Sequence, residues 1–327
     1  SLSLSLSLSL SLSLSLSHTH FSLILISLSL SLSLSLSLSR VPRCRELSVE
    51  VVTGFVQATA PESHGCMAYV LPVVVSRMGL AELQEQTEEV RLLLVQLLQT
   101  LLRSFPDHIG LFIDDYSQIL QRTLLDSFPD AKVASCACVV TLAATTPGRF
   151  KMVAKSLCKP ALAAMAHAHA KVRRAAVEAM GAVVQHGDAE VLNDVMGPLA
   201  QRSVDDNATV RRAVILVAEA WLLHLPDRYS FWHRLLPLLL SGIDDEVPDL
   251  AQLAREAFTR AGKQYETENE ADIKDRLEFE GHAAPDRPTL GCRLLVEQNL
   301  GKIVPGLLAD LTDWSAPARR LVCQSAH

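Results

Sequence analysis

The stretch DDNATVRRAVILVAEAWLL, residues 205–223, decides the fold of this 327-residue chain. It opens with an acidic, polar turn and continues with the small apolar Val210 and the basic Arg211. Apolar side chains then stand three, four, seven, eight and eleven positions after Val210. Residues at this spacing form one stripe along an α-helix. The stretch therefore predicts a turn followed by an amphipathic helix.

The same pattern recurs along the chain, and each copy can be aligned on the small apolar residue that opens the helix, here called the anchor. Successive anchors are 41, 41, 38 and 40 residues apart, and a basic residue follows four of the five. All but one of the 25 stripe positions, Ser135, are apolar. A period near 40 residues built on a helical stripe indicates a repeat array. The anchors are Val90, Ala131, Val172, Val210 and Leu250.

A second apolar helix precedes each anchored helix, so that one repeat is a helical hairpin. Several of these first helices carry an internal proline, at Pro160, Pro198, Pro237 and Pro305, where a helix bends. One hairpin cannot bury its apolar face alone, whereas stacked hairpins can. We therefore predict an all-α fold, an α-α superhelix of about six hairpins. The first helices are expected at 66–78, 109–125, 150–166, 189–203 and 229–243.

The order of proline, acidic turn, Val-Arg and second helix resembles the HEAT repeat. In that family the turn Asp and the Arg after the anchor form a hydrogen-bonded ladder. The resemblance maps the ladder onto Asp126 with Lys132 and onto Asp205 with Arg211. The basic slot that belongs to Asp245 holds Ala251, so we expect the ladder to be broken there.

Four segments follow from these patterns. Residues 1–40 are a low-complexity Ser-Leu leader, and they fit neither a secretory signal, which needs a basic start, nor a membrane helix, because every second residue is a hydroxyl. We predict disorder or a CT-dinucleotide repeat translated from the gene. Residues 41–261 are HEAT-type repeats, 262–290 an acidic insertion or loop, and 291–327 a further, truncated repeat whose turn holds Asp313. The array reads as a fragment of a longer solenoid.

The composition narrows the classes of function. Hydrophobic residues make up 49% and aromatics only 5%, which favours helices over a β-fold. The net charge of -6 argues against a nucleic-acid partner, because phosphate contacts need a basic excess. The seven cysteines are an odd number without framework spacing, and buried thiols in a reducing compartment are the expectation. No membrane partner is expected.

Few side chains form a pattern that could carry chemistry. His167-Ala168-His169 is not a metal pair, because residues i and i+2 point to different faces of a helix and no third ligand is near. Cys136-Ala137-Cys138 lacks zinc spacing, and Cys138 falls on the stripe. We expect no catalytic, cofactor or metal site. Two interpretations remain open for four basic residues. They form a basic patch for an anionic partner, or they make ladder contacts beside solvated neighbours. The residues are Lys171, Arg173, Arg174 and Arg212.

Several stretches go beyond the generic repeat: 119–126 (ILQRTLLD), 221–231 (WLLHLPDRYSF), 244–248 (DDEVP), 268–272 (ENEAD) and 311–314 (LTDW). With these the chain, over about 45–327, resembles a middle portion of the HEAT-repeat dynein axonemal assembly factors, also called the HEAT repeat-containing protein 2 family. The resemblance implies a cytoplasmic, non-catalytic scaffold for preassembly of outer and inner dynein arms of motile cilia. The partners it implies are dynein intermediate chains, other assembly factors and chaperones. The alternative is a HEAT adaptor of another kind, such as a transport receptor or phosphatase scaffold.

Overall fold

The computed structural model describes residue 27 and residues 41–60, 62–187, 191–279 and 287–312. Throughout these ranges regular structure is helical, without strands. The chain divides into two compact units, Ser1–Ala164 and Met165–His327, hereafter unit 1 and unit 2. The predictions for the Ser-Leu leader, residue 27 aside, and for the repeat turn at Asp313 lie outside the described residues.

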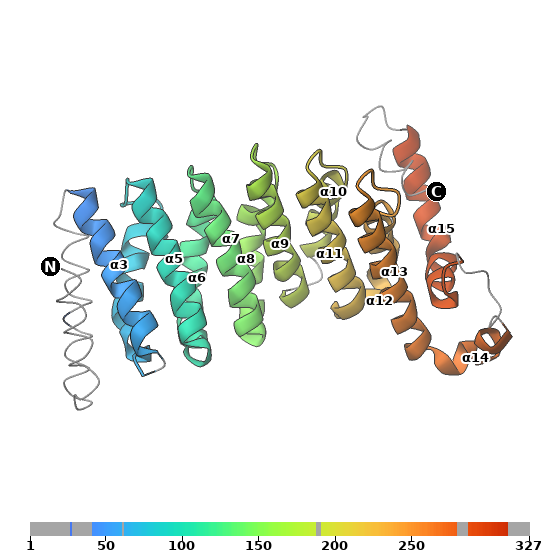
Figure 1. Cartoon of the computed structure of the whole chain (residues 1–327), viewed down its shortest axis with the longest axis horizontal. Coiled ribbons are helices and arrows are strands. Elements are labelled where there is room, and N and C mark those ends of the chain that lie inside the picture. Colours follow the sequence, from blue (N-terminus) through green and yellow to red (C-terminus); the bar gives the residue numbers. More distant parts are fainter. Residues whose placement is uncertain (1–26, 28–40, 61, 188–190, 280–286, 313–327) are drawn as a thin grey trace. The chain divides into compact units, whose positions relative to one another are not determined.

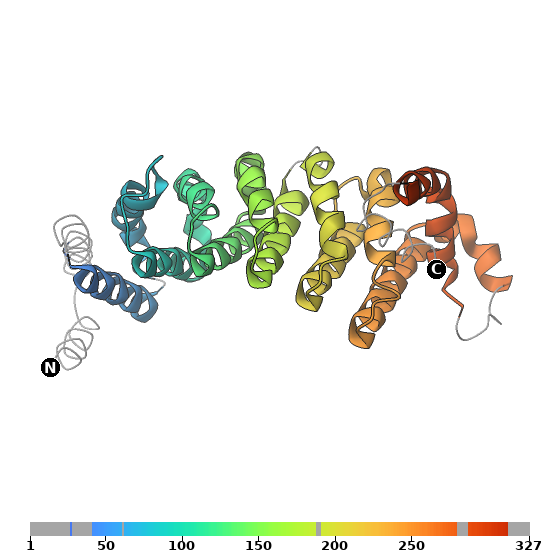
Figure 2. The same ribbon diagram turned by 90° about the horizontal axis from the view of Figure 1, so that it is seen from above.

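Unit 1 is a stack of helical hairpins in two layers (Figures 1 and 2). The second helices of the hairpins form one layer, in which α3 packs on α5 and α5 packs on α7. The first helices form the other layer, and short 3-10 or π turns extend them. The second helices are α3 (Pro42–Thr59), α5 (Glu88–Ser104) and α7 (Pro129–Thr145). The first helices and turns are η1 (His64–Cys66), α4 (Met67–Val74), η2 (Val75–Gly79), η3 (Pro106–Phe112), α6 (Ile113–Thr123) and α8 (Pro147–Met165).

Unit 2 repeats this arrangement, with α9 packed on α11 and α11 on α13, while α15 packs on both α12 and α13. The second helices are α9 (Ala170–His186), α11 (Ala208–His224) and α13 (Pro248–Glu268). The first helices are α10 (Leu192–Ser203), α12 (Arg228–Leu240) and the long α15 (Leu290–Thr312), and α14 (Glu270–Phe279) stands between α13 and α15. Most of the described part of the predicted acidic insertion is therefore helical, because α13 continues to Glu268 and α14 follows.

The fold predicted from the repeat pattern is confirmed, and each predicted first helix has its counterpart. The anchor pattern missed one helix, α3, whose ladder residue is Arg45. The interval from Cys44, the residue that precedes Arg45, to the next anchor, Val90, is longer than the others, because the polar segment 80–87 is inserted before α5. The sequence signal for α3 is the helical spacing of its buried valines, Val49, Val52 and Val56.

The stripe residues make the core, as their spacing requires. All five anchors are buried. Every stripe residue is buried as well, apart from the residue at position +3 from the anchor in three of the repeats. Ser135, the one polar member, is fully buried and donates to the Ala131 carbonyl at 2.7 Å. Trp221 is also fully buried, and its ring N–H donates to the Gly181 carbonyl of the neighbouring helix at 3.0 Å. The half-buried exceptions are Leu93, Ala134 and Leu253.

Candidate interaction surfaces

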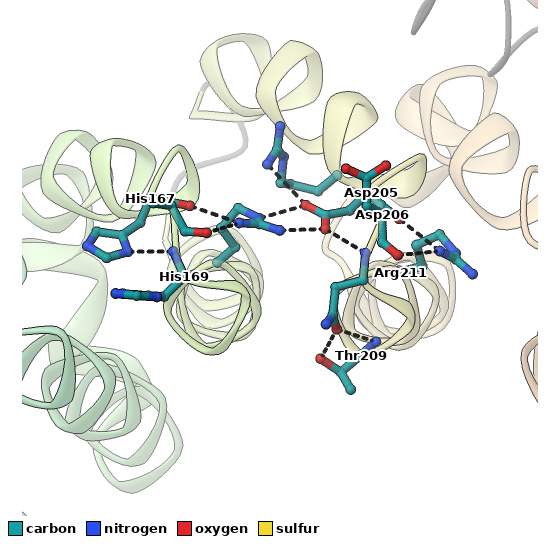
Figure 3. Close-up of polar contacts among 10 residues, drawn as sticks. His167, His169, Asp205, Asp206, Thr209 and Arg211 are labelled. Carbon is teal, nitrogen blue, oxygen red and sulfur yellow. Dashed lines mark hydrogen bonds and ion pairs between the residues drawn. The ribbon is translucent and has the colours of Figure 1, made fainter.

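The turn before α11 shows how neighbouring repeats are joined (Figure 3). The Asp205 carboxylate caps its own turn by accepting the Asn207 backbone N–H at 3.0 Å. It also accepts both Nε and Nη2 of Arg173, which starts from the preceding second helix, at 2.7 Å each. In the same way the Asp205 backbone carbonyl accepts Nη1 of Arg211 at 2.8 Å. The Asp205 carboxylate also accepts Nη1 of Arg202 at 3.1 Å, so this one residue receives three arginines.

The other ladder steps repeat this geometry. Arg91 on α5 donates to both oxygens of Asp126 at 2.7 and 2.8 Å, and Arg211 on α11 donates to both oxygens of Asp245 at 2.7 and 2.9 Å. Arg45 on α3 makes the equivalent two-pronged contact with Glu85 at 3.0 Å for both bonds. Each arginine therefore binds the acidic side chain of the next repeat, 32 to 40 residues further along the chain.

Burial makes these ion pairs structural. The exposed fractions of the Arg91 and Asp126 side chains are 7% and 0%, so water could solvate neither charge well if its partner were removed. The hydrogen bonds that Arg91 donates to Asp126 are the main cause that raises the pKa of Arg91. At Asp205 burial raises the carboxyl pKa, but the bonds from Arg173 and the Asn207 N–H outweigh it, and the net pKa is lowered. Removing one member of such a pair leaves an uncompensated charge, at a cost of about 3–5 kcal/mol.

Three parts of the predicted ladder are wrong. The Asp126 carboxylate is bound by Arg91 of the preceding repeat, and no hydrogen bond among the described residues joins it to Lys132. The Asp205 carboxylate likewise binds Arg173, whereas Asp205 accepts Arg211 only through its backbone carbonyl. The ladder is also not broken at Asp245, which Arg211 occupies. The error has one cause: Arg91, Arg173 and Arg211 each reach forward to the next turn, so an arginine after an anchor serves the following repeat.

His167 fills the acidic slot of its turn and partly imitates a carboxylate. Its Nδ1 accepts the His169 backbone N–H at 3.0 Å, where Asp205 and Asp245 use an oxygen for the same turn (Figure 3). Its backbone carbonyl accepts Nη1 of Arg173 at 3.0 Å. The turn can form without the acid because the backbone and the imidazole supply the same acceptors.

The predicted basic patch is divided by the structure. Arg173 is a ladder residue and is bound at Asp205, so it is not available to a partner. Lys171, Arg174 and Arg212 are exposed. Arg174 lies 3.5 Å from Glu178 one turn further along α9. The interpretation as ladder contact with solvated neighbours therefore holds for Arg173, and the partner surface stays a prediction for the other three.

Part of the outer surface of each second helix in unit 1 is uncharged. No charged residue occurs between Glu50 and Glu62, between Arg91 and Arg103, or between Lys132 and Arg149. These windows cover half of α3 and most of α5 and α7, which lie side by side (Figure 1). We call their exposed and half-buried side chains the neutral face. Its members include Val51, Phe55, Leu92, Gln96, Val133, Ala137 and Val140, of which Val140 is 36% exposed.

Several of the same repeat positions in unit 2 carry charge. Two residues after the anchor, unit 1 has Leu92 and Val133, whereas in unit 2 α9 has Arg174, α11 has Arg212 and α13 has the uncharged Gln252. Unit 2 also pairs charges across its helices: Arg260 on α13 contacts Glu219 on α11, and Arg228 on α12 contacts Glu268 on α13. The two units therefore share a stacking interior and differ in their outer surface. The sequence shows the uncharged windows, but only the packing of α3, α5 and α7 brings them together as one face.

The described residues offer little that could carry metal or thiol chemistry. Among them no group of three or more His, Cys, Asp and Glu side chains could hold a metal ion. The six described cysteines form no disulfide, and burial raises the pKa of Cys138 to about 12. No helix within the described ranges is long and apolar enough to span a membrane.

Comparison with solved structures supports the fold. A designed armadillo repeat protein in complex with the peptide (KR)4 superposes with a TM-score of 0.57 at 14% identity, covering 72% of this chain and 98% of that one. Kap95p, from a complex with RanGDP, superposes with a TM-score of 0.61 at 13% identity, covering 90% of this chain and 39% of that one. At this identity the likeness shows the fold alone.

Comparison with sequence families is more specific. Residues 11–276 match the family described as "Dynein axonemal assembly factor 5-like, TPR repeats", and residues 282–326 match "Dynein axonemal assembly factor 5, HEAT-repeat domain". Dynein axonemal assembly factor 5 of Xenopus laevis is 41% identical over 283 residues, and that of Homo sapiens is 41% identical over 287. These alignments cover 85% and 84% of this chain, which spans about a third of its relatives (34% and 33%). The chain belongs to the dynein axonemal assembly factor 5 family.

Proposed function

We propose that this protein is a non-catalytic scaffold for the cytoplasmic preassembly of outer and inner dynein arms of motile cilia. The observation that carries the proposal is the match to the dynein axonemal assembly factor 5 family over residues 11–276, with relatives of that name at 41% identity. A stack of helical hairpins supports it, because such arrays display repeated side chains in register for large protein partners.

We propose further that the neutral face of unit 1 contacts a dynein subunit, with an intermediate chain as the first candidate. Charged residues are depleted at the centres of protein interfaces, and the neutral face has none across three adjacent helices. Its half-buried Leu92 and Val133 and its exposed Val140 give apolar contact area without a hydrophobic surface large enough to precipitate the protein. Other assembly factors and chaperones remain proposed partners of the full-length protein.

The test is affinity purification of the tagged protein from the cytoplasm of ciliating cells, with mass spectrometry of what is retained. Enrichment of axonemal dynein intermediate chains, and loss of dynein arms after depletion, is the expected result. Enrichment of a small GTPase or a phosphatase catalytic subunit without dynein would favour a HEAT adaptor of another kind. Normal dynein arms in depleted cells would refute the proposal.

A further inference from the structure

The charged residues of helix α8 in unit 1 are all basic. Its sequence, PGRFKMVAKSLCKPALAAM over Pro147–Met165, holds Arg149 and three lysines but no Asp or Glu. Lys151, Lys155 and Lys159 are spaced four residues apart, which places them on one face of the helix with a rise of about 6 Å between neighbours. All three are exposed. We call them the lysine stripe.

The charges of the lysine stripe are not used inside the protein. The ion pairs within 4.0 Å among the described residues include none to Lys151, Lys155 or Lys159. The acidic side chains of the neighbouring first helix α6 are those of Asp114 and Asp115, and no ion pair within 4.0 Å joins either of them to the stripe. Burial and the neighbouring Asp114 raise the pKa of Asp115, so that carboxyl group lacks a dominant cationic neighbour.

Apolar side chains adjoin the stripe. Met152 follows Lys151 directly and is 81% exposed, the largest exposed fraction among the described large hydrophobic residues. Leu111 on η3 is 73% exposed. It follows Gly110, whose carbonyl accepts Nη1 of Arg149 at 2.6 Å, so the start of α8 lies against η3. A cationic row bordered by exposed apolar side chains is suited to a ligand that carries both negative charge and apolar surface.

We propose that α8 docks an acidic amphipathic segment of a partner protein, with a carboxylate about every 6 Å and an apolar edge. A helix with Glu or Asp at every fourth position has this spacing. The exposed Met152 and Leu111 favour a protein over RNA, whose phosphates would use the lysines and leave both apolar side chains uncovered. The first helix α10 of unit 2 has no such row, because Asn193 and Gly197 stand where α8 has Lys155 and Lys159 relative to the internal proline.

The test uses the whole chain and a defined probe, a fluorescein-labelled helical peptide with Glu at every fourth position beside a Leu edge. Fluorescence anisotropy measures its binding at low and at physiological salt. We expect saturable binding that weakens at least about tenfold in the variant Lys151→Gln/Lys155→Gln/Lys159→Gln. The matched control, Lys263→Gln/Lys274→Gln/Lys302→Gln, removes the same charge from three exposed lysines of unit 2 and should bind as the wild type does.

Three outcomes would overturn the proposal: no binding to the wild type, equal weakening in both variants, or tighter stripe-dependent binding of a single-stranded RNA of equal charge. The variant Met152→Gln should weaken peptide binding and spare any RNA binding. The docking inference assumes the proposed scaffold role only in taking the partner to be a protein. If the wild-type chain binds the peptide but captures no dynein, the scaffold role alone is refuted. If it captures dynein but does not bind the peptide, the docking site alone is refuted.

Discussion

The second helices α5 and α7 of unit 1 and α9 and α11 of unit 2 occupy the same repeat slots and differ in charge two residues after the anchor. There α5 and α7 present the half-buried Leu92 and Val133, whereas α9 and α11 present the exposed Arg174 and Arg212. The residue just before this position is Arg91 in unit 1 and Arg211 in unit 2, and both bind the next turn in the same way.

This difference separates two kinds of constraint on one helix. Ladder and stripe residues are fixed by stacking, because each one meets a neighbouring repeat. The adjoining outer residues meet solvent or a partner, so they are free to differ between units. Partner choice in a repeat array is therefore read from the outer positions, and the fold from the inner ones.

The largest expected effect comes from placing a charge on the inner side. Leu97 is fully buried on the stripe of α5, whereas Gln96 beside it is exposed. Leu97→Asp should lower the free energy of unfolding by at least about 5 kcal/mol, since an unpaired carboxylate would be buried. The matched control Gln96→Asp should change it by less than about 0.5 kcal/mol. Denaturant unfolding measures both, and equal effects would mean that the assignment of inner and outer positions is wrong.

Variants of the ladder arginines test whether the ladder stabilises unit 1 and unit 2 to the same extent. Arg91→Met and Arg211→Met should each cost about 3–5 kcal/mol, because Asp126 and Asp245 would be left as buried, unpaired charges. Hydrogen exchange of the α5 and α11 amides locates the loss in the affected unit. A cost below about 1 kcal/mol in one unit only would show that the ladder does not act equally in both. The exposed Arg212→Met is the control.

Acid should weaken unit 2 through Asp205. The folded-state pKa of this carboxyl is lowered, so its stabilisation is present above the unfolded pKa, near 4, and is lost as the pH falls through the folded value. Each unit of lowering corresponds to about 1.4 kcal/mol. Unfolding measured between neutral and strongly acidic pH should show this loss in the wild type, and Asp205→Asn should flatten the profile. An unchanged profile in the variant would contradict the role given to Asp205.

The smallest effect is expected for the charge pairs on the surface of unit 2. Arg260 contacts Glu219, yet its side chain is 48% exposed, and such pairs contribute at most about 1 kcal/mol. Arg260→Ala should lower the melting temperature only slightly, and the effect should shrink further in high salt. A loss as large as that of Arg211→Met would mean that the outer surface of unit 2 also holds the stack together.

Much of the fold followed from sequence because the stripe repeats at a nearly constant interval. The spacing of apolar residues around Val90 and Val210 fixes which side of each helix is buried. All five anchors lie on that side and are buried. The helix α3 was missed because the inserted segment 80–87 lengthens the interval before Val90. Periodicity detects equal spacing, and an insertion hides a repeat whose packing is unchanged.

The ladder and the outer surfaces were less accessible to sequence. The pattern correctly marks Asp126 and Arg211 as ladder residues, but it cannot tell whether an arginine binds its own turn or the next one. That choice depends on the offset between stacked hairpins, which only the three-dimensional structure supplies. The neutral face is visible in the sequence as uncharged windows, but only the packing of α3, α5 and α7 shows that these windows adjoin.

The most direct measurement compares dynein capture by variants matched in repeat position. Gln96, Ala137 and Leu216 all stand six residues after an anchor, the first two in the neutral face and the third in unit 2, where it is 42% exposed. Tagged protein carrying Gln96→Glu/Ala137→Glu should retain at least about tenfold less dynein intermediate chain than the wild type, because two carboxylates would be desolvated at the contact. Leu216→Glu should retain as much as the wild type. Undiminished capture by the first variant, with its fold intact, would contradict the proposed binding role of the neutral face.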